Sequence, residues 1–149
     1  MKEPIDYKQI VEGTTSVYVP KQKTKQKGPG KKQGLPFYNP AMEFNRDFSI
    51  AVVQWLLLNT KKEQLSLLDG LAATGIRGIR FNNELTGSFT VTINDWSEEA
   101  FSVIQKNTKN RALENIFPSY NNLNQLLLKE KFDYIDIDPF GSPALFIDS

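Results

Sequence analysis

"LSLLDGLAATGIRGIRF", residues 65–81, joins two local patterns that together decide the fold. Its first part is a short apolar run that ends in an acid and a glycine, which predicts a buried strand. From Thr74 onward the stretch opens directly into a helix. Glycine lets the backbone bend sharply between the two and approach a ligand closely. The stretch therefore predicts a strand, a tight turn and a helix in immediate succession.

The same alternation continues along the chain. "FTVTINDWS" (89–97) is a strand that leads into a helix, and later segments predict a strand in "NIFPSY" (115–120), a helix in "LNQLLLKE" (123–130) and a strand in "FDYIDID" (132–138). Such alternation implies right-handed crossovers and a parallel sheet covered on both faces. We predict an α/β fold with a Rossmann-like, doubly wound, mostly parallel sheet.

In an open parallel sheet, ligands bind beyond the carboxyl ends of the strands. The turn after residue 69 is a candidate ligand loop there, with Asp69 and Gly75 as candidate cofactor contacts, although ordinary strand-to-helix connection chemistry also accounts for it. Gly70, Gly75 and Gly78 do not have the Gly-x-Gly-x-x-Gly spacing of dinucleotide sites, which argues against NAD.

Asp95 ends the next strand, where a carboxylate can accept hydrogen bonds from both ribose hydroxyls of a nucleoside. The alternative is helix capping, because Ser97 is placed to cap a helix whose first turn holds Glu98 and Glu99. We favour the ribose contact.

"FDYIDIDPFGSP" (132–143) ends the last predicted strand in a carboxylate, a proline and an aromatic ring. Asp138 can accept a hydrogen bond from an exocyclic amine while Phe140 stacks on the planar base. Asp136 is a competing acid on the same face of the strand, but it lies deeper, where we expect a structural hydrogen-bonding role. Asp138 is therefore the candidate general base.

The first third of the chain predicts a hairpin over residues 5–19 that turns at Glu12-Gly13.

Residues 21–34 hold six lysines and no acid, which favours either contact with a phosphate backbone or a solvated linker. We divide the chain into a hairpin and basic loop (1–34) and a catalytic part (35–149). The next helix has an apolar stripe made of Phe44, Phe48, Ala51, Val52, Trp55 and Leu58, and we assign Phe44, Phe48 and Trp55 to the core.

Composition narrows the chemistry. The 149 residues contain no cysteine and no histidine, which excludes disulfides, Cys/His zinc sites, thiol nucleophiles and histidine bases. Acid-base chemistry must use Asp, Glu, Lys or Tyr, and no metal is required. The longest apolar stretch, "IAVVQWLLL" (50–58), is too short to span a membrane, and no secretory signal is evident, so we expect a cytoplasmic protein.

Four motifs in order carry a family resemblance: "FYNPAMEFNRD" (37–47), "LAATGIRGIRF" (71–81), "INDWS" (93–97) and "IDIDPFGSP" (135–143). Together they closely resemble the tRNA guanine-26 N2-dimethyltransferase family, from about Glu12 to the last residue. The resemblance implies a Rossmann-like methyltransferase fold, S-adenosylmethionine as cofactor, tRNA as partner, and methylation of the N2 amine of guanine 26.

The resemblance also implies roles for matching residues. Arg46 and Arg77 would hold the methionine carboxylate and adenosine of the cofactor, Asp95 its ribose, Asp138 would be the catalytic carboxylate, and Phe37 and Phe140 would sandwich the guanine. The family places an acid and a small apolar residue beside the adenine. Here Asn122 and Leu123 stand at that position, and the Asn carbonyl can still accept a hydrogen bond from the adenine amine.

The family's sheet needs about three strands beyond residue 138, and its second domain contributes to tRNA binding. We therefore expect a chain truncated after its fourth strand, whose fold is completed by a second polypeptide or a missing C-terminal region. Three alternatives stay open: methylation of adenine N6, a non-catalytic RNA-binding fragment, and a nucleotide-dependent oxidoreductase.

Overall fold

The computed structural model describes residues 5–21, 35–109, 114–139 and 141–146. Its elements along the chain are β1 (Tyr7–Glu12), β2 (Thr15–Pro20), the 3-10 helix η1 (Pro40–Met42), α1 (Glu43–Asn59), β3 (Leu65–Asp69), α2 (Ile76–Glu84), β4 (Phe89–Asn94), α3 (Glu98–Thr108), β5 (Ile116–Ser119), α4 (Leu123–Lys129), β6 (Tyr134–Asp136) and the 3-10 helix η2 (Pro143–Phe146). The predicted alternation of strands and helices is confirmed.

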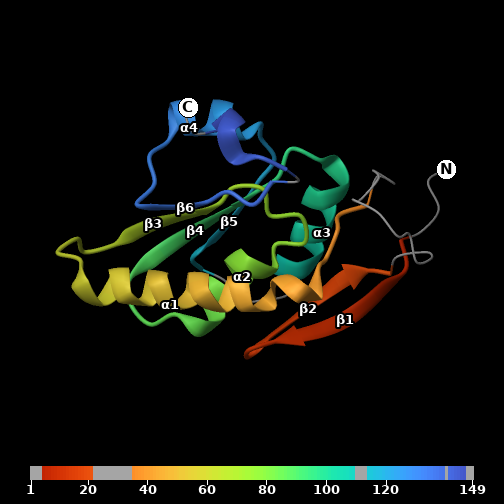
Figure 1. The fold of residues 1–149 in the computed structure, drawn as a ribbon, viewed down its shortest axis with the longest axis horizontal. Helices are drawn as coiled ribbons and strands as arrows, with labels where there is room; N and C mark the ends of the chain where they lie inside the picture. Colours follow the sequence, from red (N-terminus) through yellow and green to blue (C-terminus); the bar gives the residue numbers. More distant parts are fainter. Residues whose placement is uncertain (1–4, 22–34, 110–113, 140, 147–149) are drawn as a thin grey trace.

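The central sheet has the order β5-β4-β3-β6, and all its pairings are parallel. Figure 1 shows α1, α2 and the hairpin on one face of the sheet, and α4 with η2 on the other. Successive side chains of β3 lie on opposite faces of the sheet. Leu67 belongs to the main core on one face, and Leu68 packs with Leu123 and Leu126 of α4 on the other. The predicted Rossmann-like parallel sheet is therefore confirmed.

The N-terminal hairpin forms as predicted and is part of the main core. β1 and β2 pair in antiparallel register around a turn at Gly13, whose φ of +53° suits glycine. Val17 and Val19 of β2 are fully buried in the same cluster as Val53 of α1. The division of the chain at residue 34 stays a prediction, and the lysine tract beyond Lys21 lies outside the described residues.

The assignment of the α1 stripe to the core is wrong. Phe44, Phe48 and Trp55 are 79%, 63% and 62% exposed, and α1 instead buries Arg46, Ser49 and Val53. Periodicity identifies the stripes of a helix but does not say which one faces the sheet. The stripe that faces inward is mixed. Arg46 and Ser49 have charged partners there, while Val53 is buried and Ile50 and Leu57 pack against the core.

No helix within the described residues is long and apolar enough to cross a membrane.

The close packing of α2 on β4 gives a test of the fold. A Cβ added at Gly78 would lie 2.5 Å from Cγ1 and 2.7 Å from Cδ1 of Ile93, a fully buried side chain. We expect Gly78→Ala to lower the free energy of unfolding by about 1–3 kcal/mol, because α2 or Ile93 must move. Urea denaturation measures this. Unchanged or higher stability, as helix propensity alone predicts for Gly→Ala, would contradict the packing.

Candidate active site

The candidate site lies at the carboxyl ends of β3, β4 and β6. Asp69 is the last residue of β3, Asp95 follows β4, and Asp138 lies two residues beyond β6. Because the three strands are adjacent and parallel, these carboxylates share one edge of the sheet. The sequence prediction that they converge there agrees with the fold.

The loop between β3 and α2 is fastened to the strands on both sides. The backbone N–H of Gly70 donates to the carbonyl of Asp136 (2.9 Å), and that of Ala72 donates to the carbonyl of Asn94 (2.9 Å). A Cβ at Gly70 would lie 3.1 Å from the Asp136 carbonyl oxygen, so a side chain here would require its neighbours to shift by a few tenths of an ångström. Gly75 has a φ of +76° and begins α2. The loop can thus bring backbone N–H groups close to a ligand.

Asp69 lies beneath this loop and is buried. Its Oδ2 accepts a hydrogen bond from the backbone N–H of Gly78 (3.0 Å). Burial raises the pKa of Asp69 to about 7, and the nearby positive charge of Arg77 opposes the rise. The structure therefore gives Asp69 a contact with α2, while a contact with the cofactor stays a prediction.

Asp95 braces the same loop from β4. Its Oδ2 accepts from the backbone N–H of Ala73 and its Oδ1 from that of Ser97, both at 2.9 Å. Ser97 itself caps α3, since its Oγ accepts from the N–H of Ala100, as predicted. Asp95 is only 7% exposed, and the contact of its carboxylate with ribose hydroxyls stays a prediction. Burial raises its pKa.

Asn94 is a positioning residue that the sequence interpretation missed. Its side chain is fully buried and links the ends of three strands. Its Oδ1 accepts from Ser119 Oγ (2.8 Å) and from the N–H of Asn121 (3.1 Å), while its Nδ2 donates to the carbonyls of Gly70 (3.0 Å) and Asn121 (3.1 Å). The signal available in the sequence was a second polar residue at the end of an otherwise apolar strand.

Asn122 and Leu123 follow β5. Asn122 caps α4, because its Oδ1 accepts from the N–H of Gln125 (3.3 Å). Leu123 is buried, and its Cδ1 would lie 3.0 Å from a Cβ at Gly70. Their side chains thus have structural partners, and their proposed contacts with adenine stay predictions.

Arg77 connects the two acids of the β6 corner. Its Nε lies 3.1 Å from Oδ1 of Asp136, and its Nη2 lies 3.1 Å from Oδ2 of Asp138. Two residues of α1 complete the cluster, because Nη1 donates to Ser49 Oγ (2.6 Å) and Nη2 to Asn45 Oδ1 (3.0 Å). The guanidinium thus holds a positive charge beside the candidate base.

The two acids differ in exposure and in partners. The side chain of Asp136 is 13% exposed and accepts from Tyr134 OH (3.1 Å) and Ser49 Oγ (3.3 Å), whereas that of Asp138 is 47% exposed. Burial raises the pKa of Asp136, while Arg77 and the two hydroxyls lower it. Asp136 therefore has the deep structural position expected of it, and Asp138 is the acid that a substrate can reach.

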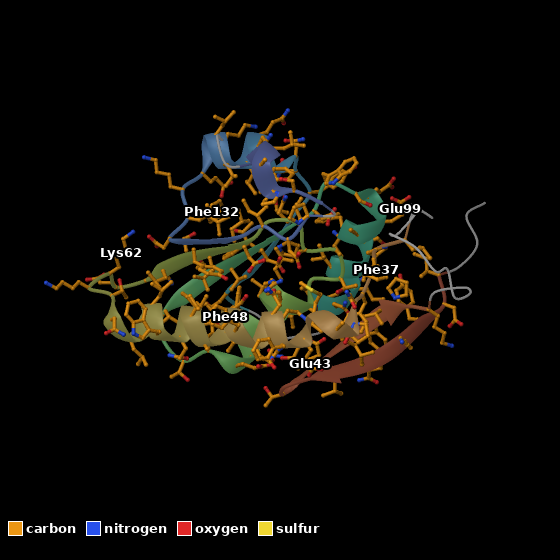
Figure 2. The ribbon with its side chains drawn as sticks, in the orientation of Figure 1. Phe37, Glu43, Phe48, Lys62, Glu99 and Phe132 are labelled. Carbon is orange, nitrogen blue, oxygen red and sulfur yellow. The ribbon has the colours of Figure 1, made fainter. Side chains whose placement is uncertain are left out.

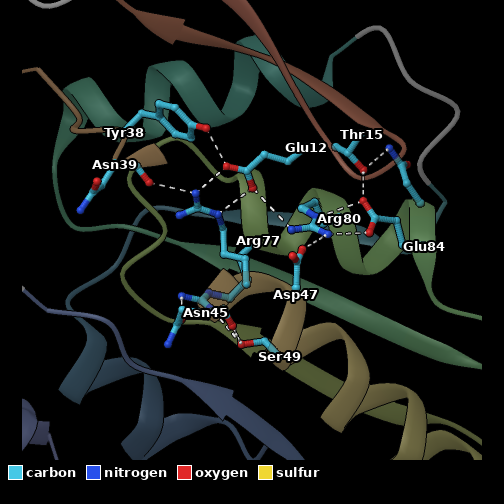
Figure 3. A network of polar contacts seen from close by, with 12 residues as sticks. Glu12, Thr15, Tyr38, Asn39, Asn45, Asp47, Ser49, Arg77, Arg80 and Glu84 are labelled. Carbon is cyan, nitrogen blue, oxygen red and sulfur yellow. Dashed lines mark hydrogen bonds and ion pairs between the residues drawn. The ribbon is translucent and has the colours of Figure 1, made fainter. Parts of the chain in front are cut away.

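Arg46 lies in a second charged cluster, centred on Glu12 (Figure 3). The carboxylate of Glu12 is fully buried and accepts from Arg46 Nε (2.8 Å), Arg46 Nη2 (2.5 Å) and Tyr38 OH (2.7 Å). Burial and the neighbouring Glu12 raise the pKa of Tyr38 to about 12, so its hydroxyl keeps the proton it donates. Arg46 Nη2 also donates to the carbonyl of Asn39 (3.0 Å).

Arg80 extends the cluster to the hairpin turn and α2. Its Nη1 lies 3.5 Å from Glu12 Oε2, and its Nη2 lies 2.7 Å from Asp47 Oδ1 and 2.9 Å from Glu84 Oε2. Glu84 Oε1 in turn accepts a hydrogen bond from the Thr15 hydroxyl of the hairpin (2.9 Å). The cluster thereby ties the hairpin, α1, α2 and the segment before η1 together. The structure places Arg46 in this support, apart from the Asp138 contact made by Arg77.

Phe37 lies in the segment before η1 and is 39% exposed (Figure 2). Tyr38 and Asn39, the next two residues, are held by the Glu12 cluster, so the position of Phe37 depends on it. Phe140 lies outside the described residues. The predicted sandwich of a base between Phe37 and Phe140 therefore stays a prediction.

Together these features define an α/β domain with a candidate ligand site at the carboxyl edge of its sheet. In the solved structures it is similar to wild-type Trm5b from Pyrococcus abyssi, with a TM-score of 0.52 and 14% identity, over 87% of this chain and 38% of that one. That likeness supports the fold alone.

Sequence comparison identifies the family. Residues 13–149 match the family model described as N2,N2-dimethylguanosine tRNA methyltransferase, and the chain belongs to this family. Curated relatives named tRNA (guanine(26)-N(2))-dimethyltransferase include those of Sulfolobus acidocaldarius (44% identical, 93% of this chain, 36% of the relative) and Methanosarcina barkeri (41%, 96% and 38%). The chain spans little more than a third of the length of these relatives, in their N-terminal part.

The Glu12 cluster gives a prediction on stability. Glu12→Gln removes the charge that compensates buried Arg46, so we expect a loss of about 3 kcal/mol or more in the free energy of unfolding. Glu84→Gln is the matched control, because Glu84 belongs to the same cluster but shares Arg80 with Asp47. Urea denaturation compares the two variants. Equal losses would contradict a central role for Glu12.

Asp69 gives a prediction on pH dependence. Its pKa is about 7 in the folded chain against an ordinary value of 3.8, so between these values the folded state binds the extra proton. Stability from this group is therefore full at low pH and is lost as the pH rises towards 7. We expect Asp69→Asn to flatten the fall in unfolding free energy between pH 4.5 and 7.5.

Asp133→Asn is the control for this measurement. Lys62 and the N–H of Ser66 lower the pKa of Asp133, so it titrates below the chosen pH range. The Asp133 variant should keep the slope of the unmodified chain. An unchanged slope in Asp69→Asn would show that Asp69 is ionised throughout the range.

Proposed function

We propose that this protein takes part in the transfer of methyl groups from S-adenosylmethionine to the exocyclic N2 amine of guanine 26 in tRNA, giving N2-methyl- and N2,N2-dimethylguanosine. The proposal includes a cytoplasmic location. Membership of the family supports the reaction. The observation that carries it onto this chain is the half-exposed carboxylate of Asp138, held beside the Arg77 guanidinium at the ligand edge of the sheet.

The residues at that edge fit the proposed cofactor. The glycine-bearing loop of residues 70–75 is fastened on both sides, and Asp95, at the end of β4 beside this loop, is the proposed ribose contact. Arg77 offers a guanidinium for the methionine carboxylate, and Asn122, Leu123, Asp69 and Gly75 are further proposed contacts at this edge. Arg46 is also a proposed contact, but its guanidinium is bound by the buried Glu12, apart from this edge. When bound, S-adenosylmethionine supplies an electrophilic methyl group.

Asp138 is the proposed general base. A guanine amine is a poor nucleophile because its lone pair is delocalised into the ring. A carboxylate that accepts a hydrogen bond from this amine localises the lone pair and takes the proton as the nitrogen attacks. Arg77 holds this carboxylate in place, since its Nη2 lies 3.1 Å from Asp138 Oδ2. Phe37 and Phe140 would hold the extruded base between them, in line with the methyl group.

We further propose that turnover needs more polypeptide than this chain. The relatives are more than twice as long as this chain. The lysine tract of residues 21–34 would contact tRNA phosphates, and the additional polypeptide would make the other contacts with tRNA. The additional polypeptide is either the C-terminal region of a longer chain or a separate subunit.

Mass spectrometry of tRNA nucleosides tests the function. Residues 1–149 are joined to the part of the Sulfolobus acidocaldarius relative beyond the matched region, and this chimera is incubated with S-adenosylmethionine and tRNA. We expect methylated guanosine at position 26, and a loss of about 100-fold or more in rate for Asp138→Ala. Asp138→Asn, which keeps the shape of the side chain, should lose activity equally.

Other outcomes would contradict the proposal. N6-methyladenosine as product would favour an enzyme acting on adenine. A folded chimera that binds tRNA but methylates nothing, with binding unchanged in Asp138→Ala, would favour an RNA-binding fragment. Tighter binding of NAD than of S-adenosylmethionine by calorimetry would favour an oxidoreductase.

A further inference from the structure

The loop between β3 and α2 contains a tight turn with an unusual backbone. The N–H of Gly75 donates to the carbonyl of Ala72 (2.8 Å), which closes the turn over residues 72–75. Ala73, its first central residue, has a φ of +50°, and among the described residues no other residue except glycine has a positive φ. Turns with a positive φ at that position normally carry glycine or asparagine there. The turn is therefore strained, and neighbouring groups must hold it in shape.

Two side chains hold this turn from different elements. Asp95, after β4, accepts a hydrogen bond from the N–H of Ala73 (2.9 Å), and Nδ2 of Asn107 in α3 donates to the carbonyl of Thr74 (3.0 Å). In a regular helix this carbonyl would accept from the N–H of Gly78, but that N–H donates to the carboxylate at the end of β3. Asn107 therefore supplies the donor that the second central residue of the turn needs.

Asn107 also binds the N-terminal hairpin. Its Oδ1 accepts from the N–H of Tyr18 (2.8 Å), and its Nδ2 donates to the carbonyl of Tyr18 (2.9 Å). The amide thus pairs with both backbone groups of this residue, as a neighbouring strand would. Lys106 adds cation–π contacts, with its Nζ 4.9 Å from the ring centres of Tyr7 and Tyr18. Figure 1 shows β2 beside α3, and the buried Asn107 joins both to the turn.

We propose that Asn107 is a positioning residue for the cofactor. It holds the turn of residues 72–75 in the shape that receives S-adenosylmethionine, and it makes that shape depend on the docked hairpin. The inference rests on the proposed function, because it takes S-adenosylmethionine as the cofactor. Asn107 acts through the Thr74 carbonyl and needs no contact with the cofactor itself.

A coupling between hairpin and cofactor follows from this geometry. One amide group serves both Tyr18 and Thr74, so a hairpin that leaves α3 also frees the turn. By linkage, a docked hairpin favours cofactor binding, and bound cofactor favours the docked hairpin to the same extent. The hairpin leads directly into the lysine tract of residues 21–34, so contacts of that tract with tRNA can act on the same equilibrium.

The rival interpretation is a purely structural asparagine that fastens the hairpin to α3. Such a residue would affect the stability of the fold and leave the affinity for the cofactor unchanged. A role in positioning affects both, and it predicts that relief of the strain at Ala73 compensates the loss of Asn107. The two interpretations therefore differ in measurable quantities.

Calorimetry with S-adenosylmethionine provides the first test, in the chimera with the Sulfolobus acidocaldarius segment. We expect Asn107→Ala to raise the dissociation constant about tenfold, because the turn relaxes when Thr74 loses its donor. Leu65→Ala is the matched control, since Leu65 is buried at the first position of β3, at the opposite end of the strand from the turn. It should lower the urea midpoint and change the dissociation constant by no more than about twofold.

Ala73→Gly is the rescue variant, because glycine adopts a positive φ without strain. In the unmodified chimera it should raise the urea midpoint and leave the dissociation constant nearly unchanged. Combined with Asn107→Ala, it should restore most of the lost affinity. The rise in urea midpoint should be larger when Asn107 is present, since Asn107 is what keeps the turn strained.

Three results would overturn the role of Asn107. They are an unchanged dissociation constant in Asn107→Ala, the same dissociation constant for Asn107→Ala with and without Ala73→Gly, and a lower urea midpoint for Ala73→Gly in the unmodified chimera. The last measurement needs no substitution of Asn107, so it holds even where Asn107→Ala does not fold.

Hydrogen exchange tests the coupling to the hairpin. The N–H of Tyr18 donates to Asn107, so its exchange rate reports how often that contact opens. Saturating S-adenosylmethionine should slow this exchange several-fold. The N–H of Thr86 is the matched control, because it donates to the side chain of Gln54 at the same distance of 2.8 Å, before the start of β4. Equal slowing of the two amides, or none at Tyr18, would contradict the coupling.

These readouts are independent of methyl transfer. A chimera that shows the predicted changes in affinity and exchange but methylates no tRNA would reject the proposed function and leave the role of Asn107 standing. A chimera that methylates guanine 26 and binds S-adenosylmethionine equally well with and without Asn107 would do the reverse.

Discussion

The buried carboxylate of Glu12 is the contact on which most of the arrangement depends. It compensates the charge of Arg46, approaches Arg80 and accepts a hydrogen bond from the Tyr38 hydroxyl, so four separate parts of the chain meet at one charge. Burying a carboxylate is costly unless its partners satisfy it, and removing one partner leaves the others unpaired. The cluster therefore fixes α1 with Arg46 on its inner side. In this orientation of α1, Ser49 and Asn45 accept hydrogen bonds from Arg77, and Arg77 also forms an ion pair with Asp138.

The parallel sheet and the hairpin could be predicted from the sequence because their signals are local. An apolar run, a glycine turn and a capped helix are each contained within about 15 residues, and the structure reproduces them in order. The orientation of α1 could not be predicted, because both of its stripes have helical spacing. What holds Arg46 on the inner side is Glu12, more than 30 residues earlier in the chain, and no local sequence pattern predicts that contact.

The same distinction applies to the candidate site, where some residues could be predicted from the sequence and others could not. The positions of Asp95 and Asp138 follow from the ends of their strands, and the greater depth of Asp136 follows from strand alternation. The role of Asn94 did not emerge from the sequence, because it depends on the carbonyl of Gly70 and on residues after β5, which only the assembled sheet brings together. Arg46 and Arg77 have the same residue type but different partners, a difference that is decided by tertiary structure.

The shortness of β6 has a consequence for motion. β6 contains three residues and has one neighbouring strand among the described elements, and Asp138 is attached to its end. Segments with few ladder hydrogen bonds open locally at a smaller free-energy cost than the centre of a sheet. The arms of Arg77 reach this segment from α2, a helix packed against the core, and so limit its excursions. The candidate base thus combines a loosely held backbone with a firmly anchored counter-charge, and the fraction of time it spends in position is set by an ion pair more than by the sheet.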